Sequence, residues 1–260
     1  MLLSDTTSNY MGGALETLDK NGNVPLHVQV SDFVREKIYS REWGVEERIP
    51  SEHELMAMLG LSRGTVQKGI RALVDEGLLV QQRGRGTYVT QPVMARPSSN
   101  RLLSYAESMH AQGIDFVTRV VELRRETAGK ACAQFLQLNQ GEKCLYLSRV
   151  RSVDNKPVMF IESHLNIRVA PGLEMVDFSQ EGLFAAVERL SGRGVGSSEV
   201  TYRARTAGRM RAKYLECDEH TPILECAQLV RLDDGTPVEW GSVWLPANRC
   251  VISSETRREV

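Results

Sequence analysis

The chain has 260 residues, of which 42% are hydrophobic and 25% are charged, and its formal net charge is -1 at pH 7. This composition is typical of a folded protein with one large domain or two ordinary ones, and it excludes a disordered or collagen-like chain. The small net charge argues against a protein that coats nucleic acid without sequence preference. No apolar run reaches the length of a membrane span and the N-terminus lacks a secretion signal, so we expect a cytoplasmic protein with no membrane partner.

The N-terminal segment begins with a polar stretch and then becomes periodic. Residues 1–23 contain Gly12-Gly13 and Asn21-Gly22-Asn23 and no sustained apolar period, which predicts a flexible arm. Apolar residues then recur at helical spacing from Leu26 to Tyr39, which predicts a first helix that ends at Trp43-Gly44.

Two further short helices are predicted after Pro50. Ser51 can cap the first of them, with Glu54 completing a capping box, and Gly60 ends it. Ser62 can cap the next helix, whose apolar face continues to Gly77. Two short helices joined by so tight a turn predict a helix-turn-helix.

A short hairpin follows the third helix. Strand-like runs at residues 78–82 and 87–89 flank Arg83-Gly84-Arg85-Gly86, where glycine supplies the positive φ angles that such a turn needs. Residues 24–91 therefore read as a winged helix-turn-helix. The polar, proline-broken residues 92–100 predict a linker.

The third helix and the hairpin concentrate basic side chains in one segment. Arg63 could bond a guanine bidentately and Gln67 could read a base edge, whereas Thr65 and Lys68 suit phosphate contacts. The basic hairpin would approach DNA from the minor-groove side. The alternative is a solvated helix face without DNA. The residues expected to contact DNA are Ser51, Glu52, Ser62, Arg63, Thr65, Gln67, Lys68, Arg83, Gly84 and Arg85.

The segment from Pro25 to Val89 resembles the DNA-binding domain of the GntR family of bacterial transcription regulators. The motifs that carry the resemblance are Pro25-Leu26, Trp43, Ile49-Pro50-Ser51-Glu52, Leu55, Leu61-Ser62-Arg63-Gly64-Thr65-Val66, Leu73, Glu76-Gly77-Leu78 and Gly84-Arg85-Gly86-Thr87. Two positions depart from the family pattern. Gln67 stands where arginine is usual, which implies a different operator sequence, and Gly69 replaces the usual alanine, which predicts a helix weaker by about 0.5 to 1 kcal/mol.

Residues 101–257 alternate long strands with isolated helices, which predicts an α+β domain with a mainly antiparallel sheet. The expected strands are 116–126, 143–153, 157–166, 195–206, 223–232 and 237–245, and the expected helices are 102–112, 128–136, 183–190 and 207–216. The hairpins "RSVDNKPVMFIES" and "RLDDGTPVEWGS" look alike, so an approximate internal repeat is possible.

The segment from Leu102 onward resembles the HutC branch of the GntR family, whose UTRA domain binds effectors and is similar in fold to chorismate lyase. Arg149 and Arg151 alternate with apolar neighbours and so project from one side of a strand, where they could bind an anion; the alternative is a solvent-facing strand edge. Trp244 to Arg249 depart from the family's aromatic-Arg-x-Asp pattern, which predicts a different pocket rim. The residues expected to bind effector are Ser104, Tyr105, Arg149, Arg151, Glu162, Ser163 and Glu239.

The cysteines and histidines predict no metal and no cofactor. The cysteines form no CxxC pair and lie in apolar segments, which favours buried reduced thiols, and the histidines lack ligand spacing.

These patterns predict a transcription regulator, by resemblance a repressor, rather than an enzyme. We expect a homodimer that reads an inverted repeat in double-stranded operator DNA, joins the nucleoid when bound there, and responds to a small anionic effector such as a phosphorylated sugar or a carboxylate. Two alternatives are a lyase-like enzyme, with Glu162 as acid and the two arginines as an anion clamp, and a chromosome-structuring DNA binder without effector.

Overall fold

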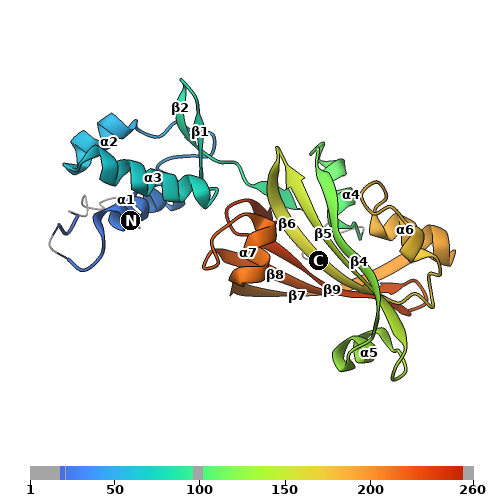
Figure 1. The fold of residues 1–260 in the computed structure, drawn as a ribbon. Helices are drawn as coiled ribbons and strands as arrows, with labels where there is room; N and C mark the ends of the chain where they lie inside the picture. Colours follow the sequence, from blue (N-terminus) through green and yellow to red (C-terminus); the bar gives the residue numbers. More distant parts are fainter. Residues whose placement is uncertain (1–17, 21, 96–101, 254–260) are drawn as a thin grey trace, which may run out of the picture. The chain divides into compact units, whose positions relative to one another are not determined.

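The computed structural model describes residues 18–20, 22–95 and 102–253. The chain divides into two compact units, Met1–Gln91 and Pro92–Val260, each of which has hydrophobic core clusters of its own (Figure 1). Residues 1–17 and 21 of the predicted arm, and residues 96–100 of the predicted linker, lie outside the described residues.

The first unit contains the predicted helices and hairpin. Its elements are α1 (Leu26–Tyr39), α2 (Glu52–Leu59), α3 (Arg63–Asp75), β1 (Leu79–Gln82) and β2 (Gly86–Val89). The Ser51 hydroxyl accepts a hydrogen bond from the Glu54 amide and the Glu54 carboxylate accepts one from the Ser51 amide, so the predicted capping box is present. Ser62 caps α3 and Gly60 ends α2 in the left-handed conformation, as their positions in the sequence predict.

Gly69 has a packing role that the helix-propensity argument misses. A Cβ atom at this position would lie 2.8 Å from the His27 carbonyl oxygen and 2.8 Å from the Val30 side chain. The Ser31 hydroxyl also donates to the Gly69 carbonyl oxygen at 3.0 Å. Glycine therefore permits the close approach of α1 and α3. The lower helix propensity expected for glycine at this position is the cost of that close packing.

The second unit is built on one six-stranded antiparallel sheet with the strand order β4-β5-β6-β9-β8-β7. Its strands are β4 (Val117–Thr127), β5 (Lys143–Val153), β6 (Lys156–Leu165), β7 (Val195–Thr206), β8 (Pro222–Leu232) and β9 (Pro237–Pro246). Its helices are α4 (Tyr105–Ala111), α5 (Lys130–Leu136), α6 (Leu183–Ser191) and α7 (Gly208–Leu215), and a short 3-10 helix, η1 (Leu173–Met175), was not expected. The predicted α+β class with a mainly antiparallel sheet is confirmed.

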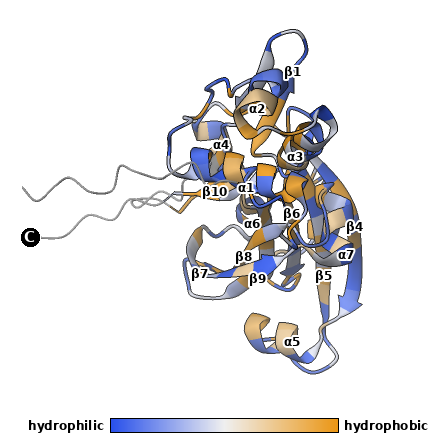
Figure 2. Ribbon diagram, turned by 90° about the vertical axis from the view of Figure 1, so that its left-hand side faces the viewer, coloured by the Kyte–Doolittle hydropathy of each residue, from blue (hydrophilic) through white to orange (hydrophobic). Residues whose placement is uncertain are grey.

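Helices cover both faces of this sheet. Strand residues such as Leu147 and Val243 point to one face, where they pack in the clusters of α6 and α4. Phe160 and Trp240 point to the opposite face, toward α7 and α5 respectively. Figure 2 colours the ribbon by hydropathy and shows hydrophilic residues at the turn between β1 and β2.

The predicted linker begins later than the sequence suggests. Val93–Ala95 form strand β3, which pairs in parallel with β10 (Cys250–Ile252), so these residues belong to the second unit. A three-residue strand whose partner is remote in the chain leaves no local pattern, because the hydrogen bonds that define it come from the other end of the domain. Among the described residues, no helix is long and apolar enough to cross a membrane.

Candidate functional sites

The first candidate site is the exposed surface of α3. Val66, Ile70 and Leu73 bury one side of this helix in the core of the first unit, which leaves the N-terminal polar residues outward. The Arg63 side chain is 74% exposed, and Gln67 and Lys68 are also exposed. A Cβ atom on Gly64 would meet nothing within 4 Å, so another backbone can approach this face closely.

Glu52 on α2 links two of these polar residues. Its Oε2 accepts a hydrogen bond from Gln67 Nε2 at 2.8 Å and lies 3.9 Å from Arg63 Nε. Ser51 and Ser62 serve as helix caps, and the Ser62 hydroxyl also lies 2.9 Å from the Thr65 hydroxyl. The caps and the Glu52 contacts therefore order the surface before any ligand is bound.

The hairpin supplies the second basic element of this unit. β1 and β2 pair from Leu79 opposite Val89 to Gln82 opposite Gly86, and the turn between them exposes Arg83, Gly84 and Arg85. Gly84 has a φ of 75°, a conformation that a larger residue would adopt only with strain. A helix with exposed polar residues beside a basic turn is the arrangement of a winged helix-turn-helix.

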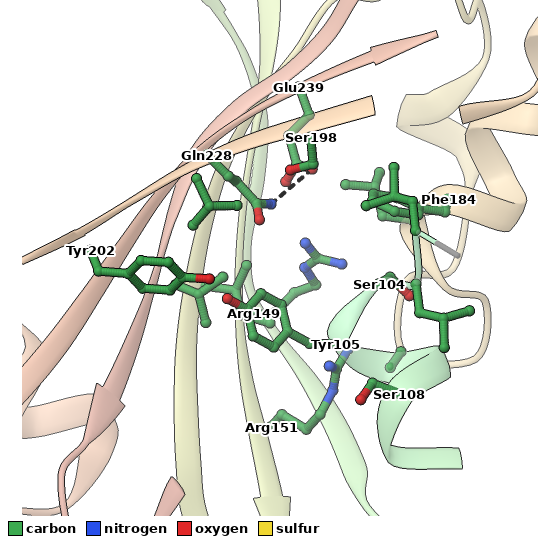
Figure 3. Close-up of a pocket in the computed structure, with 17 residues that line it drawn as sticks. Ser104, Tyr105, Ser108, Arg149, Arg151, Phe184, Ser198, Tyr202, Gln228 and Glu239 are labelled. Carbon is green, nitrogen blue, oxygen red and sulfur yellow. Dashed lines mark hydrogen bonds between the residues drawn. The ribbon is translucent and has the colours of Figure 1, made fainter. Parts of the chain in front are cut away.

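The second candidate site is a cavity of about 340 Å³ between the sheet and helices α4 and α6 (Figure 3). Its walls combine apolar side chains with polar side chains that could orient a small molecule. The polar residues that line it are Ser104, Tyr105, Ser108, Arg149, Arg151, Ser198, Tyr202, Gln228 and Glu239. The apolar side comes from residues such as Ile161, Leu183 and Val243.

Arg149 and Arg151 both reach this cavity from β5, and each is only 4% exposed. Arg149 Nη2 donates to the Ser163 hydroxyl at 3.2 Å, while its buried Nε lacks a hydrogen-bond partner among the described residues. Arg151 Nε donates to the Thr118 hydroxyl at 3.4 Å, and its guanidinium lies over the Phe116 ring at 4.5 Å. The two cations predicted to share one face of a strand do so, buried rather than at a solvent-facing edge.

Burial also changes the proton affinity of these side chains. Desolvation lowers the pKa of Arg149, and it lowers the pKa of Arg151 to about 9, with the like charge of Arg149 as a further cause. With a pKa of about 9, Arg151 remains a cation at neutral pH, so the cavity holds a poorly compensated positive charge.

Glu239 provides the acidic side of the cavity. The Ser163 hydroxyl donates to its Oε1 at 2.5 Å and Gln228 Nε2 donates to its Oε2 at 3.1 Å. Burial raises the pKa of this carboxyl, although both hydrogen bonds and the charge of Arg149 act in the opposite direction. A chain of contacts therefore runs from Arg149 through Ser163 to Glu239, with the polar groups of Figure 3 arranged around it.

Ser104 and Tyr105, which begin α4, line the same cavity. The Ser104 hydroxyl caps α4 by accepting from the Glu107 amide at 3.2 Å. The Tyr105 side chain is partly buried, and this desolvation raises the pKa of its hydroxyl. The structure thus brings these two predicted residues to the arginine pair.

Glu162 is not brought to the cavity, in contrast to the sequence expectation. It lies on the opposite face of the sheet, where it accepts hydrogen bonds from Tyr146 and from the Trp244 indole at 2.8 Å, and lies 3.4 Å from Arg211 Nη2. The reason is strand alternation, since Glu162 and Ser163 are adjacent and must point to opposite faces. Ser163 shares the cavity face with Arg149 and Glu239 and bonds to both, but it is fully buried and is not among the residues that line the cavity.

Several cavity residues were not predicted from the sequence. Ser108, Ser198, Tyr202 and Gln228 come from α4, β7 and β8, and they line the cavity beside the predicted residues. The sequence gives a weak indication of Gln228 only, because alternation places this polar residue on the same face of the strand as the buried Cys226 and Val230. The others become visible only when the sheet is assembled.

The cysteines are free thiols, of which Cys217 is half-buried and the others are buried. The Sγ atoms of Cys132 and Cys144 lie 3.6 Å apart. Within the described ranges, no group of three or more His, Cys, Asp or Glu side chains could hold a metal ion.

These two sites define a DNA-binding regulator with a ligand-binding domain, and the comparisons with known proteins agree. Residues 26–89 match the family of bacterial regulatory proteins described as gntR, and residues 111–250 match the UTRA domain. The chain belongs to the GntR family of transcription regulators and, in its second unit, to the UTRA domain family. The predicted family and the predicted repressor class are confirmed, and relatives are regulators rather than enzymes.

Two curated relatives illustrate the match. The chain is 28% identical over 200 residues to the histidine utilization repressor of Pseudomonas aeruginosa, covering 77% of this chain and 79% of the relative. It is 25% identical over 222 residues to the transcriptional repressor NagR of Bacillus subtilis, covering 85% of this chain and 90% of the relative.

A solved structure shows the same fold. The crystal structure of PhnF from Mycobacterium smegmatis matches with a TM-score of 0.61 and 22% identity, covering 88% of this chain and 99% of that one. At this identity the match supports the fold alone.

Proposed function

We propose that this regulator is a repressor whose affinity for operator DNA is controlled by a small anionic metabolite, bound in the cavity between the sheet, α4 and α6. The observation that carries the proposal is the buried pair Arg149 and Arg151. Among the described residues that line the cavity, Glu239 is the single carboxylate facing these two cations. A buried charge without a counter-charge is costly, so an anion that enters the cavity gains strong charge-assisted hydrogen bonds.

The cavity also limits the shape of the metabolite. Apolar walls suit a body with few polar groups, whereas Glu239 and Gln228 suit a hydroxyl or amine on the side away from Arg151. A phosphorylated sugar and a carboxylate both remain within this class. The names of relatives, such as the histidine utilization repressor and the probable fructoselysine utilization operon repressor of Escherichia coli, support a link to the use of small molecules.

On the DNA side, the residues predicted above remain our candidates for contact. Arg63 and Gln67 would lie at base edges, Thr65 and Lys68 near phosphates, and the hairpin with Arg83 and Arg85 on the minor-groove side. One recognition helix reads few base pairs, so we propose a homodimer on an inverted repeat. A cytoplasmic location, with nucleoid association on the operator, is part of the same proposal.

The lyase alternative loses its chemical basis in this arrangement. It required Glu162 to act as an acid next to the two arginines, and Glu162 lies on the other face of the sheet. Binding of a metabolite is the simpler use of the cavity.

The test is a thermal-shift screen of the full chain with phosphorylated sugars, amino sugars and small carboxylates. A ligand at a hundred times its dissociation constant stabilises the folded state by about 2.7 kcal/mol. A compound that stabilises the protein should also change its affinity for operator DNA, because the coupling between the two ligands is reciprocal.

The decisive variant combines Arg149→Ala with Arg151→Ala. It should keep operator binding and lose the response to the anion, whereas Arg231→Ala, outside the cavity lining, should keep both. An undiminished response of the double variant at the wild-type ligand concentration would place the effector elsewhere. Sedimentation that shows only monomer at micromolar concentration, with and without operator, would contradict the dimer.

A further inference from the structure

The contact between Glu52 and Gln67 determines how Gln67 can present itself to DNA. Glu52 begins α2 and Gln67 lies one turn after Arg63 on α3, and the Gln67 Nε2 to Glu52 Oε2 distance is 2.8 Å. The contact joins the two helices of the helix-turn-helix at the surface. Gln67 is exposed, so the rest of its amide is available to a ligand.

A carboxylate can only accept hydrogen bonds, whereas a glutamine amide has one accepting edge and one donating edge. Glu52 therefore requires the Nε2 group of Gln67 to point toward it. This leaves Oε1 and the second Nε2 hydrogen for other partners. Without Glu52, the Gln67 amide could rotate by half a turn, so that Oε1 and the Nε2 group exchange their positions.

Adenine matches the groups that remain. In the major groove it presents the N6 amino group as a donor and N7 as an acceptor, and glutamine can pair with both at once. Guanine presents O6 and N7, two acceptors, so O6 would face the Gln67 oxygen and repel it. Thymine also places an acceptor, O4, in the groove.

We propose that Gln67 reads an adenine in each operator half-site and that Glu52 is the positioning residue that makes this reading specific. The proposal rests on the function proposed above, sequence-specific binding of operator DNA through α3. Gln67 stands where arginine is usual in the family, and a different operator sequence was expected for that reason. The proposal places this difference at one base pair in each half-site.

Glu52 can carry a negative charge at this surface because its neighbours compensate it. It lies in the first turn of α2, where a helix stabilises negative charge, and Arg63 Nε is 3.9 Å away. The arrangement therefore positions Gln67 without leaving an isolated carboxylate against the phosphates.

The test is selection of binding sites from a randomised duplex library by the full-length protein and by three variants. The wild type should select an adenine at one position of each half-site and should prefer it about tenfold over guanine there. Gln67→Arg should change that base to guanine, because arginine pairs with O6 and N7 and can still contact Glu52.

Glu52→Gln should reduce the preference for adenine over guanine to about threefold or less, because either edge of Gln67 can then face DNA. A helix-stabilising role of Glu52 would lower the affinity for all sequences and leave the preference unchanged. Lys68→Ala is the matched control on the same helix and should weaken binding to all sequences without changing the selected bases.

The outcomes separate this proposal from the general one. A wild type that selects no sequence would contradict both. A selected motif in which no position responds to Gln67→Arg, or an adenine preference that survives Glu52→Gln in full, would overturn the Gln67 assignment alone. Circular dichroism spectra of the variants should match the wild type, since both side chains lie at the surface.

Discussion

The two hairpins of the sheet, β5–β6 and β8–β9, share one topology and contribute different charges to the cavity. Each belongs to a series of helix, strand, helix and hairpin, which is α4–β4–α5–β5–β6 in one half and α6–β7–α7–β8–β9 in the other. The halves meet where β6 pairs with β9 at the centre of the sheet. The internal repeat that the hairpin sequences indicate thus extends to the whole domain.

The pairing registers show which residues correspond. Arg149 pairs with Ile161 and Gln228 pairs with Gly241, so Arg149 and Gln228 occupy equivalent positions. In the same way, Arg151 pairs with Met159 and Val230 pairs with Glu239. Met159 in the first half and Glu239 in the second therefore occupy equivalent positions. The first half therefore supplies cations and the second half supplies an acid and an amide, which gives a repeated backbone a cavity with two chemically different sides.

The largest expected effect comes from breaking the junction of the halves. A Cβ atom on Gly241 would lie 2.2 Å from the Glu162 carbonyl oxygen, a backbone atom that cannot move without disturbing β6. Gly241→Ala should lower the free energy of unfolding by about 3 kcal/mol, measured by chemical denaturation. The neighbouring change Ser242→Ala removes one long hydrogen bond and should cost less than about 1 kcal/mol.

Removing a cation from the first half should affect anion binding next most strongly. Arg151→Met should weaken the affinity for the metabolite by about thirtyfold, because a charge-assisted hydrogen bond is lost in a buried site. Arg231→Met, in the other hairpin, should leave the affinity unchanged. Isothermal titration of both variants checks this comparison, and equal losses would show that the cavity arginine has no special role.

Removing the acid from the second half should act in the opposite direction. Glu239→Gln keeps the shape of the side chain and removes a group that can carry a negative charge near Arg149, so the affinity for anions should rise by up to about tenfold. Glu225→Gln, on the opposite face of the sheet, serves as the control. A fall in anion affinity for Glu239→Gln would mean that Glu239 contacts the anion through a shared proton.

The smallest expected effect is a dependence on pH that belongs to the first half alone. The pKa of Arg151 is about 9 in the folded protein and higher in the unfolded chain, so the unfolded chain binds more protons between the two pKa values. The stability of the unliganded protein should therefore rise with pH in that window, because the buried cation becomes neutral.

Anion binding needs the charged form and should follow the opposite course. The affinity for sulfate, whose charge is constant here, should be level near pH 7 and fall up to about tenfold from pH 9 to 10. Arg151→Met should lack this decrease. A wild-type affinity that stays constant through this range would show that the guanidinium keeps its proton.

Local signals in the sequence were sufficient for most of the elements. The capping box at Ser51, the cap at Ser62 and the glycine turn at Gly84 act over a few residues, so their effects can be read without the fold. Strand alternation likewise placed Arg149 and Arg151 on one face, which the buried pair confirms. The motifs of the first unit also identified its family.

Tertiary structure alone decided which residues meet in the cavity. An alignment of the two hairpin sequences on Pro157 and Pro237 places Arg151 opposite Arg231 in the alignment. In the structure the strand register shifts at Arg151/Ser152 and at Val230/Arg231, so the residue equivalent to Arg151 is Val230. A shift of one residue moves every side chain to the other face, so the phase of one strand relative to the next cannot be inferred from either strand alone. Glu162 and Ser163 could not both face the cavity because adjacent strand residues alternate, but only the assembled sheet shows that Ser163 is the one on that face. Helix periodicity and caps are properties of a short segment, whereas facing and register depend on hydrogen bonds between strands that are distant in the chain.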